Sequence, residues 1–385
     1  MRICMVFPGM LGELPPAITA AVALRQLGDE VTMVAAGCEE LTKQILRENN
    51  VEWLGLGMTR YPRGSLGKAR LRLQFGLLLH GCVRKMHPDV VWYHTAHAME
   101  YRRQVDRRAP DALTVAHAHE LYDDHGRLRG LQERTIAASA CWIAPEKNRG
   151  EMLRTASSSR TPWWIVPNRP LETLGDPPNG GTGAMEVFRR HGGSPDCRRF
   201  VIYQGLIAED RCLLQIVEAF RQVRGPELGL IILGDGRNRR FVERLRAAAH
   251  GDGRIAMIAR IVPPLHLRVT AGADVGLLLY APTSLNNLFC APGKLFEYAW
   301  CGVGVVMPLF PSLTAITEPF GFGRGCDPLD VSSIAGAVQH ELDREPNERR
   351  SAAAAFLRAS PSPPEIYSEV GGFLRQLVIE RRRTP

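Results

Sequence analysis

A lysine and a glutamate stand three residues apart near residue 295, at the expected start of a helix. Pro292 and Gly293 open this helix, and proline is tolerated at the first helical position because its missing N–H would have no partner there. A helix start offers free backbone N–H groups and the positive end of the helix dipole, which attract anions. Lys294 and Glu297 project from nearly the same face. The ammonium suits a diphosphate, and the carboxylate one turn further suits vicinal hydroxyls such as those of a ribose.

The choice of lysine at this position is informative. Of the 48 lysine and arginine residues only five are lysines, and Lys294 is the only one after Lys147. An ammonium is a compact point charge, unlike the planar guanidinium that this chain uses almost everywhere else. We therefore favour an anion-binding role for Lys294 over the alternative, a lysine placed by chance on a solvated helix start.

A histidine and a glutamate follow an expected strand in the first half of the chain. The apolar run at 112–117 reads as the strand, and His119 and Glu120 come directly after it. In open parallel sheets, ligands bind outside the carboxyl ends of the strands. A single histidine is more often a core residue with its hydrogen bonds satisfied, but at this place we favour a functional role for His119.

Two runs of alternating strands and helices must position these groups. The first run has a strand at 2–8, then a helix, then a strand at 30–36, and this order predicts a parallel sheet. The intervening turn lacks the G-x-G-x-x-G spacing of a dinucleotide-binding loop. The second run begins with a strand at 199–205 and includes an apolar strand at 275–281, which leads to Lys294.

The segment between the two runs has the composition of a linker. Residues 170–183 are rich in proline and glycine and poor in apolar side chains. The sequence therefore predicts an α/β protein with two tandem Rossmann-like, doubly wound domains and a cleft between them. We expect the first domain over residues 1–172 and the second over residues 184–358. A helix within 359–385 ends the chain and is expected to pack back across the domains.

Composition narrows the class of protein further. The net charge is +8, but the basic runs are short and widely spread, without the aromatic residues of a nucleic-acid-binding ribbon. We therefore expect no nucleic-acid partner. No apolar run approaches the roughly 18 residues that span a bilayer, and the first residues lead straight into a strand, so we expect no signal peptide. The nine cysteines are scattered and show no metal-ligand spacing, which favours reduced thiols in the cytoplasm.

Residues 66–86 form a long basic amphipathic pattern. Basic side chains such as Lys68 and Arg84 alternate with leucines, and the segment contains no acidic residue. A surface helix packed on the sheet is one interpretation. The other is a face for peripheral contact with a membrane surface or for docking an acceptor.

Short motifs in both halves resemble one enzyme group. His119 and Glu120 with Glu133 downstream match an H-E…E pattern, and 284–298 matches a Pro-x-Lys-hydrophobic-Phe-Glu-Tyr pattern. The chain resembles the GT-B glycosyltransferases over nearly its whole length, and in particular their retaining family-four group. Further matches are the strand–Gly–loop at 203–211, the LGxG turn at 233–236, the A-D-hydrophobic strand start at 273–276 and the closing V-x-N at 166–168.

This resemblance implies transfer of a hexose-type sugar, with retention, from a nucleotide diphosphate sugar such as a UDP- or GDP-sugar. It implies no prosthetic group and no metal, in agreement with the missing Asp-x-Asp motif. The implied catalytic residues are His119 and Glu120. The implied binding residues are Arg211, Lys294, Gly293 and Gly12 for the diphosphate, Glu297 for the ribose, and Asn286, Asn287, Phe289, Gly234 and Ile261 for the donor sugar or base.

The chain departs from the family pattern at three places. Many members carry two glutamates separated by seven residues, and here the first position is Phe289 while the second is Glu297. Leu206 replaces a frequent arginine, and Arg211 stands where lysine is frequent. These differences affect recognition of the donor sugar and point to an unusual donor or acceptor.

Several alternatives stay open at this level. The acceptor is either a small molecule, as in the biosynthesis of antibiotics and other natural products, or a cell-envelope glycan, and the nucleophile is O, N or S. A GT-B sugar-nucleotide epimerase would share the diphosphate site. A non-catalytic protein that binds nucleotide sugars is a third class. The chain is expected to act as a monomer or a homodimer.

Overall fold

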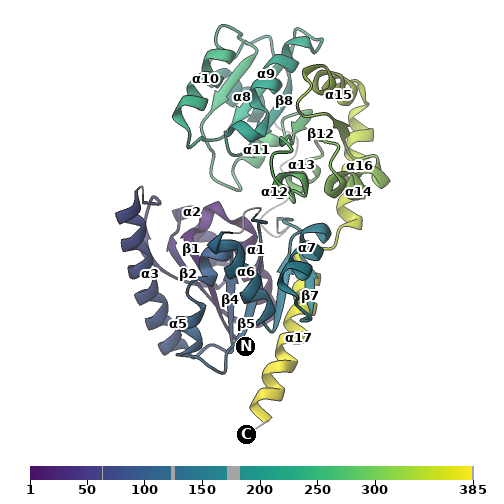
Figure 1. Ribbon diagram of the computed structural model, residues 1–385. Helices are drawn as coiled ribbons and strands as arrows, with labels where there is room; N and C mark the ends of the chain where they lie inside the picture. Colours follow the sequence, from purple (N-terminus) through teal and green to yellow (C-terminus); the bar gives the residue numbers. More distant parts are fainter. Residues whose placement is uncertain (63, 123–125, 171–182, 384–385) are drawn as a thin grey trace. The chain divides into compact units, whose positions relative to one another are not determined.

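The computed structural model describes residues 1–62, 64–122, 126–170 and 183–383. The chain divides into two compact units, one formed by Met1–Leu171 with Pro361–Pro385 and the other by Glu172–Ser360. Each unit contains one parallel sheet with helices beside it (Figure 1). The two sheets confirm the predicted α/β fold with two Rossmann-like domains. The predicted linker at 170–183 lies outside the described residues except at its two ends.

The first unit is built on a seven-stranded sheet with the order β3-β2-β1-β4-β5-β6-β7. The interior strand β1 is buried along most of its length, as expected for a parallel sheet covered on both faces. The strands are β1 (Arg2–Met10), β2 (Glu30–Gly37), β3 (Glu52–Met58), β4 (Val90–His94), β5 (Leu113–His117), β6 (Cys141–Ala144) and β7 (Trp163–Ile165).

Helices connect these strands in the first unit. The long basic pattern at 66–86 is a helix, α3, as the sequence predicted, and it buries Leu71, Phe75 and Leu79. The helices are η1 (Leu11–Glu13), α1 (Pro15–Gln26), α2 (Glu40–Glu48), α3 (Ser65–Met86), α4 (Ala96–Met99), α5 (Arg102–Asp106), α6 (Arg127–Ala137) and α7 (Lys147–Ser157).

The last helix, α17 (Pro363–Arg383), belongs to the first unit although it ends the chain. Arg375 Nη1 donates to Asp29 Oδ2 at 2.9 Å, and Arg382 Nη2 donates to Asp89 Oδ1 at 2.6 Å. The ring of Tyr367 lies 6.0 Å from the ring of Trp92, between centroids. The chain therefore returns to its first domain after completing the second.

The second unit carries a six-stranded parallel sheet with the order β10-β9-β8-β11-β12-β13. Its apolar core forms on both faces of this sheet. The strands are β8 (Arg199–Gln204), β9 (Leu228–Leu233), β10 (Ile255–Ile258), β11 (Val275–Leu277), β12 (Gly304–Pro308) and β13 (Arg324–Cys326). The helices are α8 (Gly183–Arg190), η3 (Glu209–Arg211), α9 (Leu213–Gln222), α10 (Arg239–Ala249), α11 (Leu267–Thr270), α12 (Leu285–Leu288), α13 (Gly293–Trp300), α14 (Pro311–Thr317), η4 (Glu318–Phe320), α15 (Val331–Asp343) and α16 (Pro346–Ala359).

The stretch before Lys294 differs in detail from the prediction. The strand expected at 275–281 is shorter, because β11 ends at Leu277. A short helix that the sequence did not reveal, α12, is capped by Ser284, whose side chain accepts from the Asn287 N–H. Pro292 is the N-cap of α13 and not its first helical residue, so Gly293 begins the helix.

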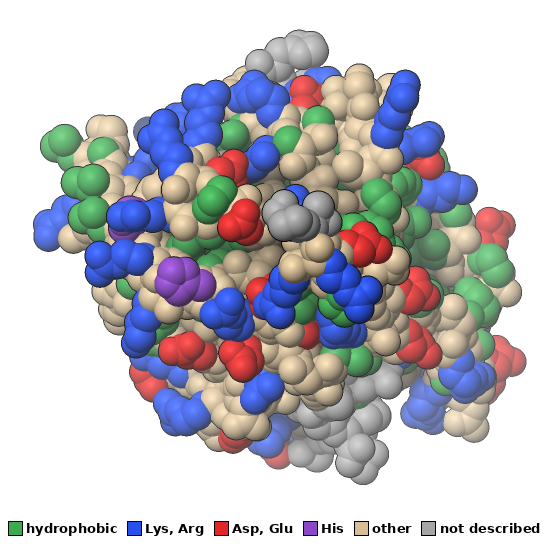
Figure 2. Space-filling view, turned by 90° about the horizontal axis from the view of Figure 1, so that it is seen from below, with side chains coloured by type: hydrophobic (Ala, Val, Ile, Leu, Met, Phe, Trp, Pro, Cys, Tyr) green, Lys and Arg blue, Asp and Glu red, His purple; other side chains and the backbone are tan. Residues whose placement is uncertain are grey.

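Charged side chains are mixed on the molecular surface. On the face drawn in Figure 2, lysine and arginine side chains lie among acidic ones and do not form one continuous track. Within the described ranges, every helix is too short or too polar to cross a membrane.

Candidate functional site

The ammonium of Lys294 lies against two aromatic rings in the second unit. Lys294 is in the first turn of α13, and its Nζ is 4.5 Å from the ring centroid of Tyr203 and 5.5 Å from that of Tyr280. Tyr203 comes from β8, and Tyr280 follows β11. An ammonium over an aromatic face is attracted by the electron density of the ring. The two rings therefore hold the lysine at the helix start, where an anion would bind.

The environment of Lys294 weakens its hold on a proton. Burial, together with the nearby Arg211 charge, lowers its pKa to about 7, and Glu297 partly opposes this shift. The side chain therefore loses its proton much more readily than an exposed lysine does. A bound anion would restore the full charge, because an opposite charge favours the ammonium.

A second cation lies close by. The guanidinium carbon of Arg211 is 4.2 Å from the ring centroid of Tyr280, so one ring contacts both Lys294 and Arg211. Arg211 Nη1 donates to Asp210 Oδ2 at 2.7 Å and to Asn287 Oδ1 at 3.4 Å. Asn287 Nδ2 donates to the same Asp210 oxygen at 3.1 Å. This small network fixes Arg211 beside the start of α13.

Glu297 is held one turn further along α13. Its Oε2 accepts from Gln204 Nε2 at 2.6 Å and lies 3.3 Å from His266 Nε2. Gln204 Oε1 in turn accepts from the Thr270 hydroxyl. Burial alone would raise the pKa of Glu297, but His266, Lys294 and Gln204 outweigh it, so the pKa lies below its usual value. The carboxylate is therefore ionised and oriented, and within the described parts of the chain its Oε1 makes no hydrogen bond.

Two glycines at strand ends allow the backbone to approach this site. Gly205, at the end of β8, has φ of +133°, and a Cβ there would lie 3.3 Å from Lys294 Nζ. A Cβ on Gly234 would lie 1.8 Å from the Gly205 carbonyl oxygen. Packing of the two strand ends thus accounts for Gly234 without invoking a donor pocket.

The structure brings together most of the predicted binding residues, but not all. Gly293, Lys294, Glu297 and Arg211 lie around the start of α13. The Asn287 amide is committed to Asp210, to the Ala281 carbonyl oxygen and to Thr283, so it shapes the loop. Asn286 lies in α12, Phe289 caps that helix, and Ile261 follows β10 and packs on the core.

Gly12 lies in the first unit, within η1. A Cβ at this glycine would lie 2.6 Å from Glu39 Oε2. A larger side chain at this position would therefore have to displace the Glu39 carboxylate. A carboxylate at this place is unfavourable for a phosphate, so Gly12 has less support as a diphosphate contact than the residues around α13.

His119 and Glu120 follow β5 in the first unit, as the sequence predicted. His119 is buried, and its Nε2 lies 3.1 Å from His94 Nδ1. Arg149 Nη1 donates to the His119 carbonyl oxygen at 2.6 Å, and Gln132 Nε2 donates to that of Glu120 at 3.0 Å. The backbone is thus fixed on both sides of this pair, while the Glu120 side chain is exposed.

Comparison with solved structures identifies the architecture. HepE of Anabaena in complex with UDP and glucose superposes with a TM-score of 0.73 at 15% identity, over 97% of this chain and 99% of the other. Sucrose-phosphate synthase of Thermosynechococcus elongatus gives 0.73 at 17% identity, over 98% and 99%. A glycosyltransferase of Rickettsia africae gives 0.70 at 12% identity, over 100% and 99%. Neither a protein-family model nor a curated protein sequence matches the chain.

The chain has the GT-B glycosyltransferase fold. The expectation drawn from the short motifs is thereby confirmed at the level of the fold. In this GT-B chain, the α13 site belongs to the second unit, and His119 with Glu120 belongs to the first.

Several residues of the α13 site were missed by sequence reasoning. Tyr280 follows a strand without any local signal, and His266 and Thr270 lie around the short helix α11, between β10 and β11. Gln204 was visible as the polar end of a buried strand, and its position at a carboxyl end could have marked it. The pairing of Gln204 and His266 with Glu297 depends on tertiary contacts, so no spacing in the sequence reveals it.

Proposed function

We propose that the chain is a glycosyltransferase that uses a nucleoside diphosphate sugar as its donor. The observation that carries this proposal is the arrangement of Lys294 and Arg211 around the Tyr280 ring, with the ionised Glu297 one turn along α13. Two cations and a helix start fit a diphosphate, and an oriented carboxylate fits ribose hydroxyls. Because HepE was solved with UDP, with UDP and glucose and with UDP-glucose, we take a UDP-sugar as the first donor to test, with a GDP-sugar as the alternative.

The proposed chemistry follows from where charge develops. Breaking the bond between sugar and diphosphate makes the sugar oxocarbenium-like and adds negative charge to the leaving diphosphate. Lys294, Arg211 and the amides of α13 would stabilise that charge, since fixed donors cost little reorganisation during the reaction. We assign His119 a hydrogen bond to the sugar. Retention of configuration is part of the proposal and rests on the resemblance of the motifs.

The acceptor is proposed by class, as a small natural product or a cell-envelope glycan. On α3, the side chains of Leu66, Leu73 and Leu77 are exposed between basic residues. We propose this face as the place where the protein contacts an anionic membrane surface or docks an acceptor, because exposed apolar and basic side chains together suit such surfaces.

Product analysis with purified protein tests the function. UDP-glucose incubated without an acceptor should release UDP slowly through donor hydrolysis, and an added acceptor should speed the release. An epimerised sugar nucleotide would instead identify an epimerase. Binding of UDP without turnover of any nucleotide sugar would identify a binding protein. The melting temperature measured with UDP, GDP, ADP and TDP identifies the base of the donor. The nucleotide that binds the folded protein most tightly raises the melting temperature most.

Replacing Glu297 with glutamine should weaken UDP binding by about tenfold or more, because the charge-assisted bonds to the ribose are lost while the shape is kept. Calorimetry with UDP and with inorganic diphosphate measures the effect. Diphosphate binding should change much less, since that ligand has no ribose. An equal loss for both ligands would rule out the ribose assignment.

The affinity for UDP should fall as the pH rises above about 7. Lys294, with its pKa near 7, is increasingly neutral at higher pH and must take up a proton to bind the diphosphate. We expect binding to be about tenfold or more weaker at pH 8.5 than at pH 7, a range in which phosphate groups stay ionised. Calorimetry at constant ionic strength measures this slope. The Lys294→Arg variant should lack it, because a guanidinium stays protonated, and an equal slope in both proteins would contradict the role of Lys294.

A further inference from the structure

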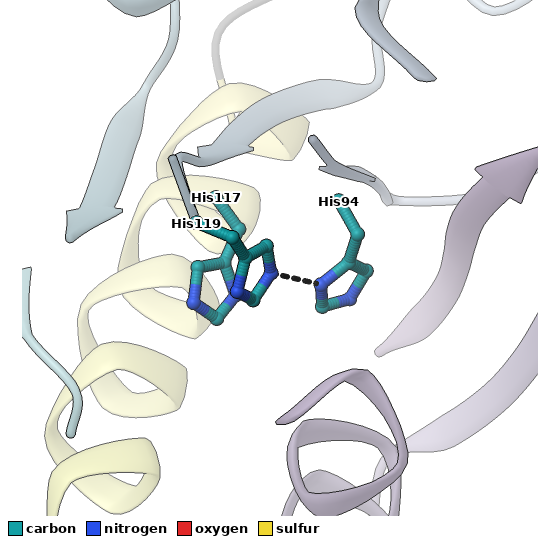
Figure 3. A group of neighbouring side chains, drawn as sticks. All are labelled: His94, His117 and His119. Atoms are coloured by element: carbon teal, nitrogen blue, oxygen red, sulfur yellow. Dashed lines mark hydrogen bonds between the residues drawn. The ribbon is translucent and has the colours of Figure 1, made fainter. Parts of the chain in front are cut away.

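Three histidines meet at the carboxyl ends of β4 and β5. His94 and His117 are the last residues of these strands and face each other in register, and His119 follows two residues later. Figure 3 shows the three rings grouped together, with His117 behind His119 and His94 opposite them. One ring nitrogen of each lies within 4.8 Å of one ring nitrogen of each of the others. All three side chains are buried, with exposed fractions of 0%, 1% and 6% for His94, His117 and His119.

The spacing within the group is that of metal ligands. His94 Nδ1 and His119 Nε2 are 3.1 Å apart and share a hydrogen bond, whose proton a metal ion would displace (Figure 3). Two nitrogens that bind one zinc ion at about 2.0–2.1 Å are separated by roughly 2.9–3.4 Å, depending on the angle at the metal. The first two nitrogens therefore have the spacing of two ligands of one metal ion, and the His117 ring, whose nitrogen lies within 4.8 Å of both, would move toward them on binding.

Each of the three rings has one nitrogen without a hydrogen-bond partner among the described residues. Burial holds the pKa of His94 and His117 well below the usual value and that of His119 at about 3, so the rings are neutral and carry one N–H each. A long contact of 3.5 Å joins Trp92 Nε1 to His117 Nδ1, and a metal ion bound at Nδ1 would displace it and leave the proton of His117 on Nε2. That atom has no partner among the described residues, and the same holds for His94 Nε2 and His119 Nδ1. Protein contacts alone thus do not account for three buried imidazoles at this place.

We propose that His94, His117 and His119 bind one zinc ion, with a water or an anion as the fourth ligand. Neutral imidazoles suit zinc and similar transition metals, whereas magnesium and calcium prefer oxygen ligands. The guanidinium of Arg149 donates a hydrogen bond to the His119 carbonyl oxygen. Its positive charge favours an anionic fourth ligand and lowers the affinity of the site for the zinc cation. Bound through Nε2, His119 would carry its proton on Nδ1, which fixes one tautomer for a hydrogen bond to a ligand.

Metal binding can be measured without turnover, so the inference does not depend on the proposed glycosyl transfer. Metal-free protein titrated with zinc sulfate in a calorimeter should bind one equivalent. The cobalt(II)-substituted protein should show the visible absorption of a four-coordinate site with nitrogen ligands. The variants His94→Ala and His117→Ala should each lose at least about tenfold in zinc affinity. His97→Ala is the matched control, because His97 lies on α4 with its side chain exposed, and it should bind zinc like the wild type.

Two further measurements separate loss of the metal site from loss of the folded structure. The melting temperature and the circular dichroism spectrum report whether each variant is folded, and the cobalt spectrum of the wild type needs no variant at all. A stoichiometry near zero, or equal zinc affinity in His94→Ala, would overturn the site. An intense sulfur-to-cobalt absorption band would assign the metal to cysteines and would also overturn it.

Discussion

Replacing His119 with alanine should lower kcat by about 100-fold or more and leave the dissociation constant for UDP within about twofold. The reason is the division of the chain, because His119 belongs to the first unit while Lys294, Arg211 and Glu297 belong to the second. A contact that matters in the reacting complex affects turnover more than nucleotide affinity, and the loss of one positioned group costs at least about 100-fold. Steady-state kinetics with a UDP-sugar and calorimetry with UDP measure the two quantities.

His97→Ala serves as the control for this substitution, because its imidazole is exposed and lies outside the proposed site. Lost UDP affinity with normal turnover at saturating donor would place His119 in the nucleotide pocket and contradict the assignment. Full activity with full affinity would make His119 a buried core residue. The kcat of His117→Ala provides a second comparison. This variant loses the proposed metal but keeps the His119 side chain, so a fall in kcat seen only in His119→Ala comes from the His119 side chain itself.

Replacing Lys294 with alanine should weaken UDP binding by about 10- to 150-fold, the effect of a charge-assisted hydrogen bond of about 1.5–3 kcal/mol. The ammonium lies against the rings of Tyr203 and Tyr280 at the start of α13, and the neighbouring Arg211 is fixed by Asp210 and Asn287. Calorimetry at pH 7 measures the change for UDP and for inorganic diphosphate. Both ligands should lose affinity, because the contact is to the diphosphate.

The exposed Lys147 on α7 offers a matched lysine for comparison, and Lys147→Ala should bind UDP like the wild type. The melting temperature of Lys294→Ala should be close to that of the wild type. Burial disfavours the charged form of this lysine and so lowers its pKa, and removing the ammonium therefore costs the fold little stability. If Lys294→Ala kept the wild-type affinity for UDP, the anion site at α13 would have to be abandoned.

The sequence predicted the architecture because local patterns and chain order determine it. Buried apolar strands alternating with amphipathic helices specify parallel sheets, and both sheets were found. The boundaries were less accurate. The strand expected to reach residue 281 ends at Leu277, and α12 was missed because its few residues show no helical periodicity.

Part of the candidate site was also visible in the sequence. Lys294 and Glu297 could be paired because three residues along a helix place side chains on one face. Their partners could not, since Gln204, His266 and Tyr280 reach them from other strands and loops. The histidine group shows the same limit, because His94 and His117 become neighbours only through the pairing of β4 with β5. Gly234 shows the converse, since its close packing against the Gly205 carbonyl oxygen explains the glycine without a ligand.

Hydrogen–deuterium exchange with and without UDP tests the central claim most directly, because it reports where the nucleotide binds. The account predicts slower exchange in peptides that cover the end of β8 and η3 (199–211) and the start of α13 (290–300), with Lys294→Ala abolishing this protection at the same UDP concentration. Protection confined to other peptides, or none at a UDP concentration of about 1 mM, the upper range of typical KM values, would contradict it.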